Sequence, residues 1–188
     1  ALAATQSWPD HIRLSVNLST RDVVSNKTVD ALLEIIAQSG VDPTRLDIEV
    51  TETAVMRNFT LAADNIRRFA DRGIGIALDD FGTGHSSLNY VHKLPLTKIK
   101  IDRSFIVDIA TNERSRSIVK TIVDLSRNVG CVCVVEGMET HEQVAALRGL
   151  GCRMMQGYYF ARPERLEHTL ACQAPSDTIV NAPVRKTG

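Results

Sequence analysis

The sequence lacks two features that would point to a membrane or to nucleic acid. No apolar run is long enough to span a bilayer and no signal peptide opens the chain, so we expect a cytoplasmic domain without membrane contact, whatever anchor the parent protein carries. The formal net charge is zero, because 22 lysine and arginine residues balance 22 aspartate and glutamate residues. That balance argues against a binder of nucleic-acid polymers, which is usually basic. A small anionic ligand held by a metal stays compatible with it.

Motifs for zinc and for nucleotide-binding loops are missing too. No CxxC pair is present, and no nearby histidine completes a zinc site. Gly82 and Gly84 form a G-x-G, but the full Rossmann spacing and the Walker lysine are absent. We expect reduced, mostly buried thiols for the four cysteines, which are Cys131, Cys133, Cys152 and Cys172.

The sequence does contain a repeated alternation of short apolar strands with amphipathic helices. Its 188 residues are 44% hydrophobic, enough for one domain with a sizeable core. Helical spacing of apolar residues predicts longer helices at 28–38, 60–72 and 113–129, and shorter helical segments at 87–94, 103–109, 140–149 and 164–172. Strands are predicted at 11–18, 46–50, 74–78, 97–101, 131–135 and 153–155. This order implies parallel βα units, either in part of a (β/α)₈ barrel or in an open doubly wound sheet.

Each predicted strand is apolar along its body and polar at its carboxyl end. In a parallel α/β fold these ends share one rim, where ligands bind. One polar residue there means little, but six successive strands each supply an oxygen ligand or a charge. The residues at the predicted rim are Asn17, Glu49, Asp79, Asp80, Lys100, Glu136 and Gln156.

Carboxylate and amide oxygens dominate this set. Oxygen ligands suit Mg²⁺ or Mn²⁺ rather than zinc. Four carboxylates exceed what one Mg²⁺ usually takes, so two ions would neutralise them and activate a water for attack on phosphorus. Lys100 would orient that water or offset charge on the phosphate oxygens.

Several of these residues also have a purely structural interpretation. Asp79 and Asp80 could form a turn that caps the next helix. Lys100 could pair with Asp102 on the surface. Gln156 could simply satisfy backbone groups.

Six stretches in chain order resemble the EAL family of cyclic di-GMP phosphodiesterases. They are SVNLS (15–19), EVTET (49–53), DDFGTGHSSL (79–88), KIDRSF (100–105), EGMET (136–140) and QGYYFARP (156–163). The resemblance covers Ala1 to Arg165 and implies a TIM-like (β/α)₈ barrel with one antiparallel strand, here lacking its first two strands and the Glu-Ala-Leu motif. We therefore expect an EAL domain over residues 1–172 and a disordered tail over 173–188.

The resemblance also implies an activity, the hydrolysis of cyclic di-GMP to linear pGpG with two Mg²⁺ or Mn²⁺ ions. It assigns catalytic roles to Lys100, Glu136 and Asp80, with the lysine orienting the nucleophilic water. The metal ligands implied by position are Asn17, Glu49, Asp79, Asp80 and Glu136.

Further roles and partners follow from the same resemblance. Gln156 and Asp79 would bind on the substrate side, where the glutamine holds a water near the ions. Glu52 would anchor the loop 81–87, which contributes to metal binding and to a homodimer contact. The implied partners are cyclic di-GMP and regulatory domains attached in the parent protein. The alternative function is a catalytically inactive module that binds cyclic di-GMP and acts through a partner domain.

Overall fold

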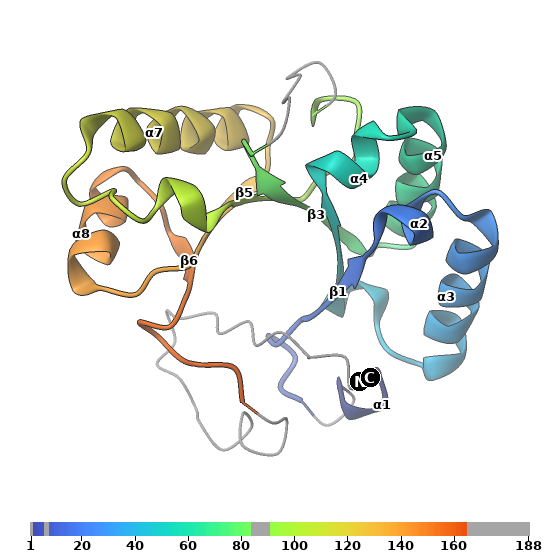
Figure 1. The fold of residues 1–188 in the computed structure, drawn as a ribbon. Helices are drawn as coiled ribbons and strands as arrows, with labels where there is room; N and C mark the ends of the chain where they lie inside the picture. The colour runs from blue at the N-terminus through green and yellow to red at the C-terminus, as the bar shows by residue number, and fades with distance from the viewer. Residues whose placement is uncertain (1, 6–7, 84–90, 165–188) are drawn as a thin grey trace. The chain divides into compact units, whose positions relative to one another are not determined.

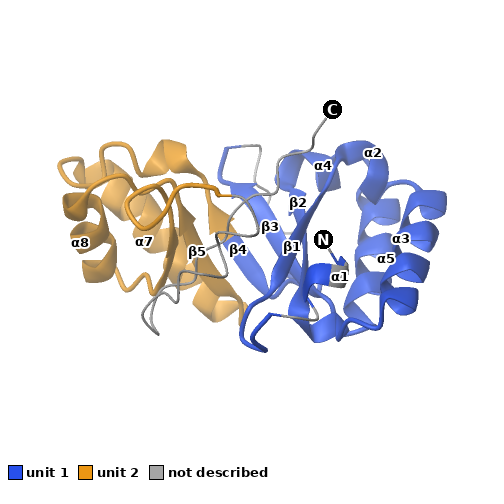
Figure 2. Cartoon of the chain, turned by 90° about the horizontal axis from the view of Figure 1, so that it is seen from below, with its two compact units in different colours: residues 1–99 blue, residues 100–188 orange. Residues whose placement is uncertain are grey.

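The computed structural model describes residues 2–5, 8–83 and 91–164, and it shows an α/β fold (Figure 1). The described residues contain six strands in one sheet, in the order β1-β2-β3-β4-β5-β6, which is also their order along the chain. The chain divides into two compact units, residues 1–99 and residues 100–188 (Figure 2). None of the described helices is long and apolar enough to cross a membrane.

Unit 1 alternates strands with helices. Its strands are β1 (Leu14–Leu18), β2 (Leu46–Thr51), β3 (Gly75–Phe81) and the beginning of β4 (Lys98–Ile101). Its described helices are α1 (Leu2–Thr5), α2 (Thr20–Val23), α3 (Asn26–Ser39), α4 (Glu52–Met56), α5 (Phe59–Ala70) and the 3₁₀ turn η1 (Pro43–Arg45).

Capping side chains explain why helices begin directly where strands of unit 1 end. Ser19 follows β1 and forms a capping box with Asp22 at the start of α2. Thr51 ends β2, and its hydroxyl accepts a hydrogen bond from the backbone N–H of Ala54 at the start of α4. Such caps satisfy the otherwise unpaired N–H groups of a first helical turn. Strand and helix therefore meet without a connecting loop, beside the polar strand ends.

The neighbouring strands of unit 1 run parallel and lie level with one another. β1 pairs with β2 from Leu14 opposite Leu46 to Leu18 opposite Val50. β2 pairs with β3 from Asp47 opposite Gly75 to Thr51 opposite Asp79. Because the paired strands begin at nearly the same level, the carboxyl ends of these three strands lie at the same edge of the sheet.

The core of unit 1 lies between these strands and the helices that cover them. Ile48 and Ile76 in the strands are at most 1% exposed, and Ile66 and Phe69 of α5, which packs on β3, are completely buried. Burying a side chain of this size contributes about 1.5–3 kcal/mol. The polar strand ends are therefore positioned by a tightly packed apolar core.

Unit 2 repeats the alternation with a smaller parallel pair. Its elements after β4 are η2 (Arg103–Phe105), α7 (Glu113–Asn128), β5 (Val132–Glu136), α8 (His141–Gly149) and β6 (Met154–Gln156). β5 and β6 are parallel, with Val134 opposite Met154 and Glu136 opposite Gln156. The completely buried residues that hold this unit together include Ile109, Val119, Val135, Met138 and Leu147.

All six predicted strands are present, with boundaries that differ by a few residues. β3 continues past its predicted end at Leu78 to Phe81, a residue that is only 3% exposed. The helix predicted at 103–109 is a 3₁₀ turn of three residues, and the short helices α2 and α4 were not predicted. Half of the predicted segment 87–94, all but one residue of the predicted helix 164–172, and the whole predicted tail lie outside the described residues.

Candidate functional site

In unit 1, the sheet register gathers three of the predicted site residues on one face. Asn17 on β1 lies directly opposite Glu49 on β2, and Glu49 lies opposite Ala77 on β3. Side chains two residues apart in a strand point to the same face, so Asp79 shares the face of Ala77. Glu49 is 7% exposed, whereas Asp79 is half-buried and Asn17 is exposed. An amide and two carboxylates therefore line one face at the strand ends.

Asp80 marks a turn in the backbone immediately after these residues. Its φ of 54° is the one positive value at a described residue other than glycine, in a region that aspartate tolerates better than most residues. Its N–H donates to Oδ1 of Asp79 at 3.0 Å, and the hydroxyl of Thr83 donates to its carbonyl oxygen at 2.8 Å. Backbone strain of this kind clusters at functional sites. The turn re-aims the second carboxylate of the pair.

Glu52 links the start of α4 to this turn. Its side chain is buried, at 7% exposed, and its Oε2 accepts a hydrogen bond from the N–H of Gly82 at 3.4 Å. This contact joins the start of α4 to Gly82, and the anchoring of the whole loop 81–87 by Glu52 stays a prediction. Residues 84–87 of the same loop lie outside the described residues.

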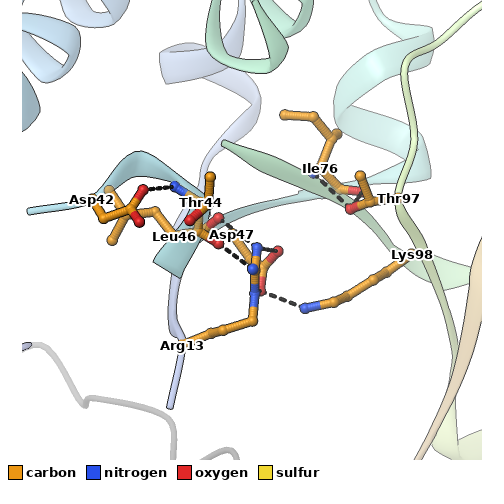
Figure 3. A network of polar contacts seen from close by, with 8 residues as sticks. All are labelled: Arg13, Asp42, Thr44, Leu46, Asp47, Ile76, Thr97 and Lys98. Carbon is orange, nitrogen blue, oxygen red and sulfur yellow. Dashed lines mark hydrogen bonds and ion pairs between the residues drawn. The ribbon is translucent and has the colours of Figure 1, made fainter. Parts of the chain in front are cut away.

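A network of charges, not predicted from the sequence, surrounds Asp47 (Figure 3). Asp47 lies two residues before Glu49 in β2 and therefore on the same face. Asp47 is 1% exposed and receives two hydrogen bonds of 2.8 Å from the guanidinium of Arg13. The ammonium group of Lys98 binds Oδ2 of the same carboxylate. Burial raises the pKa of Asp47, but the hydrogen bonds and charges of Arg13 and Lys98 outweigh burial and lower it overall.

Gly75 makes room for that network. A Cβ at this position, opposite Asp47, would collide with Asp47 Oδ1 and lie 2.8 Å from Nη2 of Arg13. The missing side chain therefore allows the carboxylate to lie flat over β3. The sequence signal for this arrangement was an acid near the start of the strand LDIEV (46–50).

In unit 2, Lys100 and Glu136 form a close ion pair. The Nζ of Lys100 lies 2.7 Å from Oε1 of Glu136, and the two side chains are 7% and 25% exposed. Asp102, the partner considered in the structural interpretation of Lys100, accepts the N–H of Ser104 at 2.9 Å and caps η2. A lysine this deeply buried needs an acidic partner, and the carboxyl end of β5 supplies one.

Gln156 faces the same way as Glu136. The two residues are opposite each other in the β5–β6 register. The Oε1 of Gln156 is buried, and it has no hydrogen-bond partner among the residues that the structure describes. The structural interpretation of this side chain as a partner for backbone groups is thus not supported for its oxygen. An acceptor left in this state is suited to a bound water or ligand.

The donor chemistry of these residues fits a hard divalent cation. Their ligand atoms are carboxylate and amide oxygens, which Mg²⁺ and Mn²⁺ prefer. The buried Gln156 oxygen is a group that a cation or its bound water would satisfy. Within residues 2–5, 8–83 and 91–164, no group of three histidine, cysteine, aspartate or glutamate side chains is arranged to hold a metal.

A protein-family model and the curated relatives point to the same family. A model of the EAL domain matches residues 1–163. The cyclic di-GMP phosphodiesterase NbdA of Pseudomonas aeruginosa is 37% identical over 154 residues, which is 82% of this chain and 20% of that protein. The chain spans between 20% and 23% of the first curated relatives that it matches, so those proteins are much longer.

Solved structures agree with the family model. The EAL domain of Mycobacterium smegmatis DcpA matches 90% of this chain, and 77% of that chain is covered, with a TM-score of 0.82 and 28% identity. Klebsiella pneumoniae BlrP1, in a complex with manganese and cyclic di-GMP, matches 86% of this chain over 42% of its own, with a TM-score of 0.78 and 30% identity. These matches confirm the predicted fold class, part of a parallel EAL-type α/β barrel. The chain belongs to the EAL domain family.

Proposed function

We propose that this chain carries the catalytic face of a phosphodiesterase that hydrolyses cyclic di-GMP to linear pGpG. The observation that carries the proposal is the register that places Asn17 beside Glu49, with Asp79 on the same face of the next strand. The buried pair of Lys100 and Glu136 supports it from unit 2. Among the relatives, NbdA is named as a cyclic di-GMP phosphodiesterase.

Two Mg²⁺ or Mn²⁺ ions belong to this proposal. Asn17, Glu49 and Asp79 would supply oxygen ligands for one ion, and Asp80 and Glu136 would supply them for the other. When bound, such ions neutralise phosphate charge and lower the pKa of water into the physiological range. BlrP1 supports this choice because its complex contains both manganese and cyclic di-GMP.

The remaining side chains would position the reactants. The Lys100 ammonium, held by Glu136, would orient the attacking water and offset charge on the phosphate oxygens. The buried Oε1 of Gln156 would accept a hydrogen bond from a water on the substrate side. Glu52, through its contact with Gly82, would keep the turn after the paired aspartates in place.

The decisive experiment incubates the full-length protein with cyclic di-GMP and Mg²⁺ or Mn²⁺ and separates the products by chromatography. We expect linear pGpG, no product in EDTA, and no product from Glu49→Gln or Asp79→Asn, because each substitution removes a charged oxygen ligand. Tight binding of cyclic di-GMP without any product would instead support the inactive binding module. Equal hydrolysis of cyclic AMP would contradict the proposed substrate.

The proposal extends to the assembly of the protein. We propose a homodimer, together with regulatory domains elsewhere in the polypeptide. The size of the full-length protein in solution, measured by light scattering, checks the dimer. A monomer at micromolar concentration would contradict it.

A further inference from the structure

Two short segments of unit 2 lead directly away from the proposed catalytic residues. Residues 101–110 follow Lys100 through η2, and residues 137–140 follow Glu136 and lead to α8. The 2.7 Å contact between Lys100 and Glu136 joins side chains from these two strand ends. Its geometry therefore depends on what holds the two segments together.

Gln143, in the first turn of α8, binds both segments through its side-chain amide. Its Oε1 accepts hydrogen bonds from the backbone N–H groups of Glu139 at 2.8 Å and Thr140 at 3.1 Å. Its Nε2 donates to the backbone carbonyls of Ile106 at 3.2 Å and Val107 at 3.4 Å. The residue is only 8% exposed, so water cannot replace these bonds unless the segments separate.

The other contacts between the segments are weaker or less specific. Arg103 and Glu139 form an ion pair of 2.7 Å, but their side chains are 56% and 44% exposed, and exposed pairs contribute little. Gly137 has a φ of +80°, and a Cβ there would lie 2.5 Å from Cγ of Arg103, so the segments approach closely. The buried amide of Gln143 is thus the principal polar link between them.

We propose that Gln143 is a positioning residue for the phosphodiester hydrolysis proposed above, on which this inference rests. Its side-chain amide forms a bracket, because it hydrogen-bonds both the segment after Lys100 and the segment after Glu136. This bracket keeps the ammonium group of Lys100 in contact with the carboxylate of Glu136. Gln143 acts through these two side chains and not on the substrate. Small displacements of reacting groups are costly, since a misplacement of about 1 Å can reduce turnover about 10²-fold.

A reciprocal pair of substitutions separates this role from helix capping. Gln143→Glu keeps the oxygen that caps the N–H groups of Glu139 and Thr140, but a carboxylate has no N–H to donate to the carbonyls of Ile106 and Val107. Thr140→Ala does the opposite. It removes the hydroxyl that accepts the backbone N–H of Gln143 at 3.3 Å and leaves the amide bracket intact.

The test uses the full-length protein and two readouts. The ¹⁵N-detected NMR signal of the Lys100 ammonium group, assigned with Lys100→Arg, reports the ion pair without substrate or ions. We expect this signal in the wild type and in Thr140→Ala, and its loss in Gln143→Glu. In hydrolysis of cyclic di-GMP, kcat of Gln143→Glu should fall about 10²-fold with KM unchanged within about twofold, while Thr140→Ala keeps both.

Other results from these two readouts would contradict the role of Gln143. A wild-type signal and kcat in Gln143→Glu would overturn it, as would equal losses in Thr140→Ala or a wild type without the Lys100 signal. If Gln143→Glu folds poorly, Gln143→Met has nearly the same length without a charge and must show the same loss. A wild type that does not hydrolyse cyclic di-GMP would refute the proposed function, while the ammonium signal would still decide whether Gln143 holds the pair.

Discussion

Asp47 and Glu49 show how differently two buried acids on one face of a strand are used. Asp47 is held by Arg13 and Lys98 on two sides, so its charge is neutralised inside the protein. Glu49 lies one pleat closer to the carboxyl end, opposite Asn17, among oxygen donors. The first is a structural anchor, and the second belongs to the proposed metal site.

Removing one cation from Asp47 should destabilise the fold. We expect Lys98→Met to lower the free energy of unfolding by about 2–3 kcal/mol, somewhat less than for a fully broken buried pair because Arg13 remains. Urea denaturation at pH 7 measures the change. Lys120→Met is the matched control, since its pair with Asp124 lies on the surface of α7 and should cost about 0.5 kcal/mol. Equal losses in both variants would contradict the anchor.

The same anchor should appear in the acid limb of the stability curve. The pKa of Asp47 in the fold lies below its ordinary value of 3.8, so on acidification the unfolded chain binds a proton first. The stabilisation from Asp47 is therefore complete above about pH 4–5 and is lost as the pH falls through the folded-state pKa. Asp47→Asn should flatten the fall in stability between about pH 5 and pH 2 relative to the wild type.

The sequence predicted the residues of the proposed site better than the contacts around them. Polar residues at strand ends predicted a shared rim, because parallel strands bring these ends together, and the register places Asn17 opposite Glu49. The ion pair of Lys100 with Glu136 was not predicted. The anchor was missed because Arg13 precedes β1, while Asp47 and Lys98 stand at the beginnings of β2 and β4, away from the carboxyl ends where ligands were expected. Periodicity predicts on which face of a strand or helix a side chain lies. It does not predict which charged residue, distant in the sequence, forms an ion pair with that side chain.

At the scale of elements, close backbone approach decides which glycines matter. A Cβ at Gly157, just after β6, would collide with the backbone N and O of Met138, whose carbonyl also accepts the N–H of Tyr159 at 3.0 Å. A Cβ at Gly149, at the end of α8, would meet nothing within 4 Å. The turns after β5 and β6 are thus packed backbone to backbone, and the end of α8 is open.

This difference gives a paired prediction. Gly157→Ala should destabilise the protein by about 1–3 kcal/mol, because one of the two turns must move. Gly149→Ala should be neutral or stabilising by up to about 1 kcal/mol, since alanine favours the helix. Thermal unfolding of both variants measures the contrast. A stable Gly157→Ala would show that the turns are not in contact.

Long elements were predictable from the sequence and short ones were not. α3 and α7 follow apolar periodicity over many residues, and their predicted positions agree with the structure within a few residues. α2 and α4 have four and five residues, too few for a period to appear. Their capping residues Ser19 and Thr51 were the available signal, because each stands where a strand ends.

At the scale of the whole molecule, alternation of strands and helices left two architectures open. An eight-stranded barrel and an open doubly wound sheet both begin with parallel βα units. Spacing alone could not choose, since a parallel pair such as β5 and β6 has the same local register in either architecture. The six motifs resolved the choice, and the match to the DcpA EAL domain agrees with them.

The thiols of unit 2 offer a probe of how the whole chain opens. Burial raises the pKa of Cys133 to about 11, although a hydrogen bond with Ser126 lowers it somewhat, and burial together with nearby Cys133 raises the pKa of Cys152 to about 12. Both are therefore protonated at pH 8 and react slowly. In a protein carrying Cys131→Ser and Cys172→Ser, we expect iodoacetamide to label them rapidly only in urea. Fast labelling of the native protein would contradict the raised pKa values of both thiols.

Gly75 has a consequence for how this chain can vary over evolutionary time. The Cβ of any other residue there would displace the Asp47 carboxylate. Arg13 and Lys98 would then be neighbouring cations without their counter-ion. Conversely, losing the acid first would remove the reason for a glycine. The four positions form an epistatic set, so a lineage that abandons this arrangement must change several of them nearly at once or pass through an unstable intermediate.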